Sequence, residues 1–97
     1  MVTVYPACFY EEKEGGYSVV FPDLNHLATC GDDLQEAMDM AVDCLAGYLY
    51  DCMEDGEELP VPSVEENIDV NAEYDDYKTA FVKNIAVDVE EYARMYF

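Results

Sequence analysis

The pattern of apolar and polar positions predicts three strands at the start of the chain. Residues 2–10 (VTVYPACFY) and 17–21 (YSVVF) are rich in β-branched and aromatic side chains, as strands are. Residues 14–16 (EGG) between them are a turn signal, so the two runs predict a β-hairpin. A third short strand is predicted at 27–30. Because Pro6 lacks the N–H that a sheet ladder needs, the first strand is expected at a sheet edge or a bulge.

The clearest helix is predicted at 34–55. Asp33 is a good N-cap residue, and Glu36 stands three residues later, as in a capping box. Gly56 suits the position just after the helix. The apolar residues recur at steps of three and four and make one stripe: Leu34, Ala37, Met38, Ala41, Leu45, Leu49 and Cys52.

The remaining residues complete an α+β fold of a single domain, 1–97. Residues 57–79 are acidic and contain prolines, and they predict a connecting loop. Residues 80–89 predict a last strand, and 90–97 a short helical tail. The core therefore comes from 2–56 and 80–89, in the order β-β-β-α-β, with one helix packed on one face of a mostly antiparallel sheet. The other face is expected to meet solvent or a second chain.

The charge excludes several classes of partner. The chain has 97 residues, with 4 Lys and Arg against 23 Asp and Glu, and a formal net charge of −19. Such a domain repels nucleic acid and anionic membranes, which attract basic residues. A hydrophobic fraction of 52% argues against disorder. Residues 32–63 contain no Lys or Arg, so the negative charge is concentrated on and around the predicted helix, and a basic partner is expected.

The four cysteines show neither a CxxC pair nor a Cys/His spacing typical of metal sites. Free thiols in a reducing cytosol are the favoured interpretation, with a disulfide framework as the alternative. Neither a signal peptide nor a long apolar run is found, so a cytoplasmic protein without a membrane segment is expected. No cofactor or metal site is predicted.

Several short motifs, taken in order, resemble the HicB-like antitoxin family. The resemblance covers residues 4–63 and 80–96. The motifs are Tyr5-Pro6-Ala7, Gly15-Gly16-Tyr17, Phe21-Pro22-Asp23-Leu24, Gly31-Asp32, Leu34-Gln35-Glu36-Ala37, and the helix exit from Glu54-Asp55-Gly56 to Pro60-Val61-Pro62-Ser63.

The resemblance implies a partial RNase H-like fold and an antitoxin that binds and blocks HicA, a small basic RNase toxin. Three features depart from the family pattern. Asn25-His26 replaces the usual Pro-Gly, residues 64–79 look longer than the usual connection, and no DNA-binding segment follows Phe97. Operator binding is therefore not expected of this chain.

A binding function is favoured over an enzyme. The carboxylates look like a solvated face rather than a two-metal nuclease centre, His26 has no nucleophile placed by sequence, and Asp51–Glu58 lacks the EF-hand pattern. The candidate partner-binding residues are acidic positions of the helix and a sheet face expected to be exposed: Asp32, Asp33, Glu36, Asp39, Asp43, Tyr17, Val19 and Phe21.

Two alternatives stay open. One is an orphan HicB-like domain that self-associates, and the other is a nucleic-acid-binding regulator that uses the nine tyrosines for base stacking. A homo-oligomer is expected under any of the three, through the uncovered sheet face, the Pro6 strand or Tyr96-Phe97.

Overall fold

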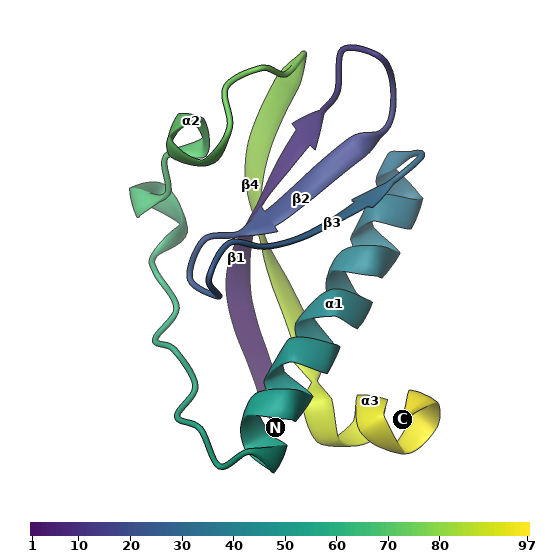
Figure 1. Cartoon of the computed structure of the whole chain (residues 1–97), viewed down its shortest axis with the longest axis vertical. Coiled ribbons are helices and arrows are strands. Elements are labelled where there is room, and N and C mark those ends of the chain that lie inside the picture. Colours follow the sequence, from purple (N-terminus) through teal and green to yellow (C-terminus); the bar gives the residue numbers. More distant parts are fainter.

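A computed structural model describes all residues, 1–97, as a four-stranded sheet with one long helix packed against it (Figure 1). The strands and helices follow the predicted order closely. They are β1 (Val2–Glu11), β2 (Tyr17–Phe21), β3 (Leu27–Gly31), α1 (Leu34–Glu54), η1 (Glu65–Asn67), α2 (Val70–Glu73), β4 (Thr79–Asp88) and α3 (Val89–Tyr96).

The sheet has the strand order β3-β2-β1-β4, and every neighbouring pair is antiparallel. The predicted hairpin is present: Cys8 lies opposite Val20, and Gly15 and Gly16 make the turn with φ of 101° and 80°. Positive φ is a conformation that glycine adopts without steric cost, which explains the two glycines at this turn. The predicted α+β class is confirmed.

The position of β1 corrects one expectation. β1 is an inner strand in the strand order, yet its ladder with β2 covers only Cys8 to Glu11. Pro6 lies before that segment and is paired with Asn84 of β4 alone. Since β1 has a neighbour on one side only at this point, the missing N–H of Pro6 is tolerated inside an inner strand.

The main core lies between the sheet and α1. Tyr5, Ala7 and Phe9 of β1 point to this side, and Ala41 and Leu45 of α1 pack against them. Small residues on the helix let it approach the sheet closely. Gly31 at the end of β3 is the tightest point, because a Cβ there would lie 2.4 Å from the backbone nitrogen of Ala37.

The second face of the sheet is covered over β1, which corrects the expectation of an open face. In Figure 1 the segment 57–79 runs along the side of the sheet opposite α1, from the end of α1 to the start of β4. Tyr10 of β1 points to this side and donates a hydrogen bond to the carbonyl of Val70 at 2.6 Å. Tyr5, on the α1 side, donates to the carbonyl of Pro60, close to where the segment leaves α1. The predicted loop contains the short η1 and α2, and we call residues 57–79 the strap.

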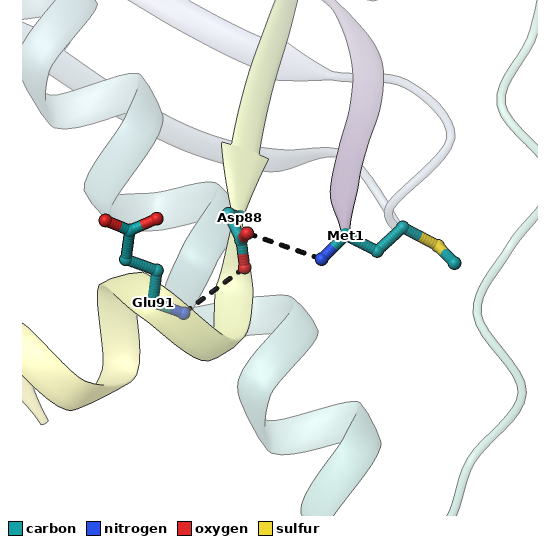
Figure 2. A network of polar contacts seen from close by, with 3 residues as sticks. All are labelled: Met1, Asp88 and Glu91. Atoms are coloured by element: carbon teal, nitrogen blue, oxygen red, sulfur yellow. Dashed lines mark hydrogen bonds and ion pairs between the residues drawn. The ribbon is translucent and has the colours of Figure 1, made fainter.

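The tail forms α3, as predicted, and its start is fixed by Asp88. Figure 2 shows that this carboxylate accepts a hydrogen bond from the Glu91 N–H at 3.2 Å and pairs with the amino group of Met1 at 3.3 Å. The bond from Glu91, followed by the positive charge at Met1, lowers the pKa of Asp88. Asp88 therefore caps α3 and joins it to the start of β1.

The cysteines are all free thiols. Cys8 and Cys52 are buried, in line with the favoured interpretation, whereas Cys30 is exposed. None of the helices combines the length and the apolar character that a membrane crossing requires.

Candidate protein-interaction site

The first half of α1 carries the five acidic residues that the sequence singled out. Asp32 and Asp33 stand just before the helix, and Glu36, Asp39 and Asp43 follow on its first three turns. All five are exposed, and no Lys or Arg occurs from residue 32 to residue 63. This part of the molecule is therefore a continuous negative surface, which we call the acidic face.

Two of these carboxylates also hold the start of the helix. The Asp33 Oδ1 atom accepts a hydrogen bond from the Glu36 N–H at 2.8 Å, and the Glu36 Oε1 atom accepts one from the Asp32 N–H at 3.1 Å. The predicted capping box is therefore present, and its charges are also favourable beside the positive end of the helix dipole.

The other two helical carboxylates accept hydrogen bonds from side chains of α1 and α3. Asp39 accepts a hydrogen bond from the Gln35 amide at 3.0 Å, and Asp43 accepts one from the Tyr92 hydroxyl of α3 at 2.9 Å. Burial and the bond to Asp43 raise the pKa of Tyr92 to about 12, so its hydroxyl stays a donor at neutral pH. Asp43 thus fixes α3 beside α1.

An apolar groove lies between α1 and β4, next to the acidic face. Its volume is about 510 Å³. Two of its apolar side chains are partly open to solvent, Leu34 at 41% and Phe81 at 37% exposed, and the Phe81 ring is stacked on Phe9 with centroids 5.1 Å apart. The lining residues are Leu34, Gln35, Met38, Phe81 and Lys83. Sequence reasoning missed Phe81 and Lys83 as site residues, because their proximity to α1 depends on how the helix crosses the sheet.

The three sheet residues predicted to be exposed lie elsewhere. Val19 and Phe21 are fully buried in the core beneath α1, and Tyr17 is half-buried against the same core. That expectation was wrong because alternate residues of β2 face opposite sides of the sheet. The set that includes Tyr17, Val19 and Phe21 is the larger and more apolar one, so it faces the helix, and Ser18 and Val20 face the other side.

A second groove lies on the face opposite α1, between the strap and strands β2 and β3. Its volume is about 520 Å³, and Tyr10, Val20, Ala28 and Tyr74 provide its apolar walls. The carboxylates nearest to it have partners already, since Glu12 accepts from Ser18 and Tyr74. Glu73 in turn contacts His26.

None of the four basic side chains forms an ion pair with a carboxylate of the acidic face. Lys13 pairs with Asp76 at 2.7 Å, and Lys78 lies 3.8 Å from Glu11. Lys83 lines the groove of β4, and Arg94 is on α3. The negative charge of α1 is consequently not neutralised within the chain, and it remains available to a positively charged partner.

Little in this arrangement suggests a reaction centre. No set of three or more His, Cys, Asp or Glu side chains is placed to hold a metal ion. His26, the single histidine, lies in a tight turn with a φ of 58° and contacts Glu73 of the strap. The arrangement favours recognition of another macromolecule through charge and an apolar groove.

Comparison with known proteins assigns the family. A family described as the HicB-like antitoxin of bacterial toxin-antitoxin systems matches residues 5–95. The chain belongs to the HicB-like antitoxin family. This is a family of antitoxins, so the prediction of a protein that is not an enzyme is confirmed at the level of the family.

Individual relatives share part of the chain or the whole fold. Antitoxin HicB 1 of Photorhabdus laumondii is 41% identical over 58 residues, which are 60% of this chain and 37% of that protein. A chain of a toxin-antitoxin complex from Streptococcus pneumoniae is 30% identical and superposes with a TM-score of 0.80, covering 95% of this chain and 73% of that chain.

A chain of the HicA3 and HicB3 toxin-antitoxin complex shares the fold at 20% identity. Its TM-score is 0.64, and the match covers 84% of this chain and 94% of that chain. The HicB-like fold is therefore present over nearly the full length of the 97 residues. The chain matches about two-fifths of the length of the curated HicB antitoxins, 37% in one case and 43% in another.

Proposed function

We propose that this chain binds and neutralises a small basic RNase toxin of the HicA type in the cytoplasm, by covering the surface that the toxin uses for RNA. The observation that carries the proposal is the acidic face of α1, which has no basic residue from position 32 to position 63, on a domain of HicB-like fold. A surface that binds RNA must be positive, and a negative protein surface complements it.

The fold comparison supports a protein partner. The superposition at a TM-score of 0.80 is with a chain taken from a toxin-antitoxin complex, and it extends over 95% of the residues described here. A partner also suits the physics of the isolated domain. Self-repulsion among 19 excess negative charges destabilises a compact chain of 97 residues, and a basic partner relieves that repulsion.

The test is inhibition of RNA cleavage. A HicA-type toxin encoded beside the gene for this chain is purified, and its cleavage of RNA is measured with increasing amounts of the chain. We expect stoichiometric inhibition at 150 mM salt, and loss of the complex at roughly 0.5–1 M salt because exposed charges are screened there. Unimpeded cleavage in the presence of excess folded chain, or the absence of any such neighbouring gene, would overturn the proposal.

Self-association without a toxin is a second candidate, and one surface favours it. Met95, Tyr96 and Phe97 are 65%, 64% and 53% exposed, so three successive large apolar side chains are open to solvent at the end of α3. Sedimentation of the chain alone tests this candidate, and a single monomeric species at high concentration would eliminate it. Direct binding of nucleic acid is not expected, and micromolar affinity for RNA or DNA at 150 mM salt would contradict that expectation.

A further inference from the structure

We infer that the groove between α1 and β4 is the docking surface for the toxin, and that it receives an apolar side chain that projects from a basic surface. This inference rests on the proposed function and adds the face of the molecule to it. At the groove two exposed apolar side chains, Leu34 and Phe81, adjoin the acidic face, so one partner can engage both surfaces at once. Protein interfaces are commonly built this way, with an apolar centre inside a polar rim.

The groove has apolar walls on two sides. Leu34 and Met38 line one wall and Phe81 the other, in a space of about 510 Å³. The Phe81 ring is held in place from below by its stack on Phe9. β4 is an edge strand, so the groove is open to an incoming partner on its outer side. A partner side chain would remove the exposed parts of Leu34 and Phe81 from water without any rearrangement of the sheet.

The charges around the groove specify a basic partner. Asp32 and Asp33 directly precede Leu34, and Asp39 is hydrogen-bonded to Gln35, which itself lines the groove. These three carboxylates are exposed, and Lys83 is the one basic residue among the lining residues. A partner with positive residues around an apolar side chain therefore meets complementary charge on the helical side of the groove.

The second groove, between the strap and β2, fits such a partner less well. It has a similar volume, about 520 Å³, but its carboxylates Glu12 and Glu73 are engaged with side chains of the same chain. Asp76, near that end of the groove, is likewise engaged, because it pairs with Lys13 at 2.7 Å. The carboxylates that line the second groove are thus engaged, whereas Asp32 and Asp33 beside the α1 groove are exposed and have no basic partner.

The experiment measures toxin affinity for matched variants of the full chain. Leu34 and Met53 are 41% and 45% exposed and lie on the same helix, but Met53 is in its last turn, away from the acidic face and the groove. We expect Leu34→Lys to weaken binding of the HicA-type toxin by about tenfold or more, as for a central contact of an interface, and Met53→Lys to change it by less than about threefold. The two variants add the same charge, so the difference reports position alone.

Leu34 is the first residue of α1, so its replacement can also disturb the start of the helix. A second variant therefore tests the groove from the side of β4. Phe81→Ala removes the wall contributed by β4 and is also expected to weaken binding about tenfold. Circular dichroism and thermal unfolding establish that each variant is folded. Equal affinities of Leu34→Lys and Met53→Lys, with wild-type binding intact, would overturn the docking surface while leaving the proposed function standing. Failure of the wild-type chain to bind the toxin would overturn the function itself. A change of oligomeric state in Leu34→Lys, without loss of toxin binding, would assign the groove to a second copy of the chain and also overturn the inference.

Discussion

Gly31 packs against the start of α1, and replacing it by Ala is expected to destabilise the chain. The same replacement at a second glycine, in the middle of α1, is expected to stabilise the chain and serves as the control. Replacing Gly31 by Ala places a Cβ atom 2.4 Å from the Ala37 nitrogen and 2.8 Å from both the Ala37 Cα and the Glu36 carbonyl carbon. Ordinary contacts between such atoms are about 3.5–4.0 Å long, so the two segments must separate by roughly 1 Å. All three atoms belong to the backbone of α1, and no flexible side chain can yield instead.

The expected cost follows from that geometry. Overpacking of a well-packed core costs about 1–3 kcal/mol, and a clash with helix backbone belongs at the upper end, about 3 kcal/mol. For a domain of this size 1 kcal/mol corresponds to about 4–8 °C in Tm, so Gly31→Ala is expected to lower Tm by roughly 12–24 °C. Gly47 is the control, because it lies inside α1 and a Cβ there meets nothing within 4 Å. Gly47→Ala is expected to stabilise the chain by about 0.5–1 kcal/mol, since glycine weakens a helix interior.

Thermal and urea unfolding, followed by circular dichroism at 222 nm, measure both effects. The slope of the urea transition should be similar in the two variants, since both unfold the same surface. A Gly31→Ala variant within about 1 kcal/mol of wild type would refute the steric reasoning, as would a shift of the same sign in both variants. Because Leu34 stands three residues after Gly31, displacement of the helix start should also weaken toxin binding in Gly31→Ala, whereas Gly47→Ala should leave it unchanged.

Three further predictions concern single polar groups. Asp33→Ala removes the N-cap bond and should lower the free energy of unfolding by about 1 kcal/mol in urea titrations, whereas Asp32→Ala, whose side chain caps nothing, should change it much less. Tyr10→Phe removes the hydrogen bond to the Val70 carbonyl and should lower the free energy of unfolding by about 1 kcal/mol. Relative to wild type, amide hydrogen exchange should become faster in the strap than in α1. The pKa of Tyr92 is raised from 10.0 to about 12, so its contribution to stability is complete below pH 10 and is lost as the pH rises to about 12. Wild type should therefore lose stability relative to Tyr92→Phe over that interval, and parallel pH profiles would contradict the assignment.

The strands and the long helix were predictable because local pattern specifies them. The stripe of apolar residues and the Asp33 cap predicted a helix at 34–55, and α1 is Leu34–Glu54. The hairpin followed from its two glycines in the same way. These signals act within a few residues along the chain, so they do not depend on how the elements pack.

The faces of the sheet were harder to predict, although a signal was present. Tyr5 to Tyr10 are six consecutive buried residues, and a strand buried on every residue is covered on both faces. That uninterrupted apolar run in β1 indicated a cover on the side opposite the helix, and the strap provides it. The groove of α1 and β4 carried no such signal, because it joins Leu34 to Phe81 across the sheet and its form depends on the crossing of helix and strand.

The acidic residues of α1 cannot be treated as one uniform charged surface. Asp33 and Glu36 hold the start of the helix, and Asp43 holds α3 through Tyr92. Neutralising any of the three therefore changes the structure as well as the electrostatic potential at the surface. Asp32 has no hydrogen bond from its side chain and is exposed, so its charge is separable from folding. The same carboxylates thus direct the folding of the helix and set the surface offered to a basic partner. Loss of binding on removal of Asp32 would report electrostatics alone. Loss on removal of Asp33 would combine electrostatics with movement of the groove wall that begins at Leu34, and loss on removal of Asp43 would combine it with movement of α3.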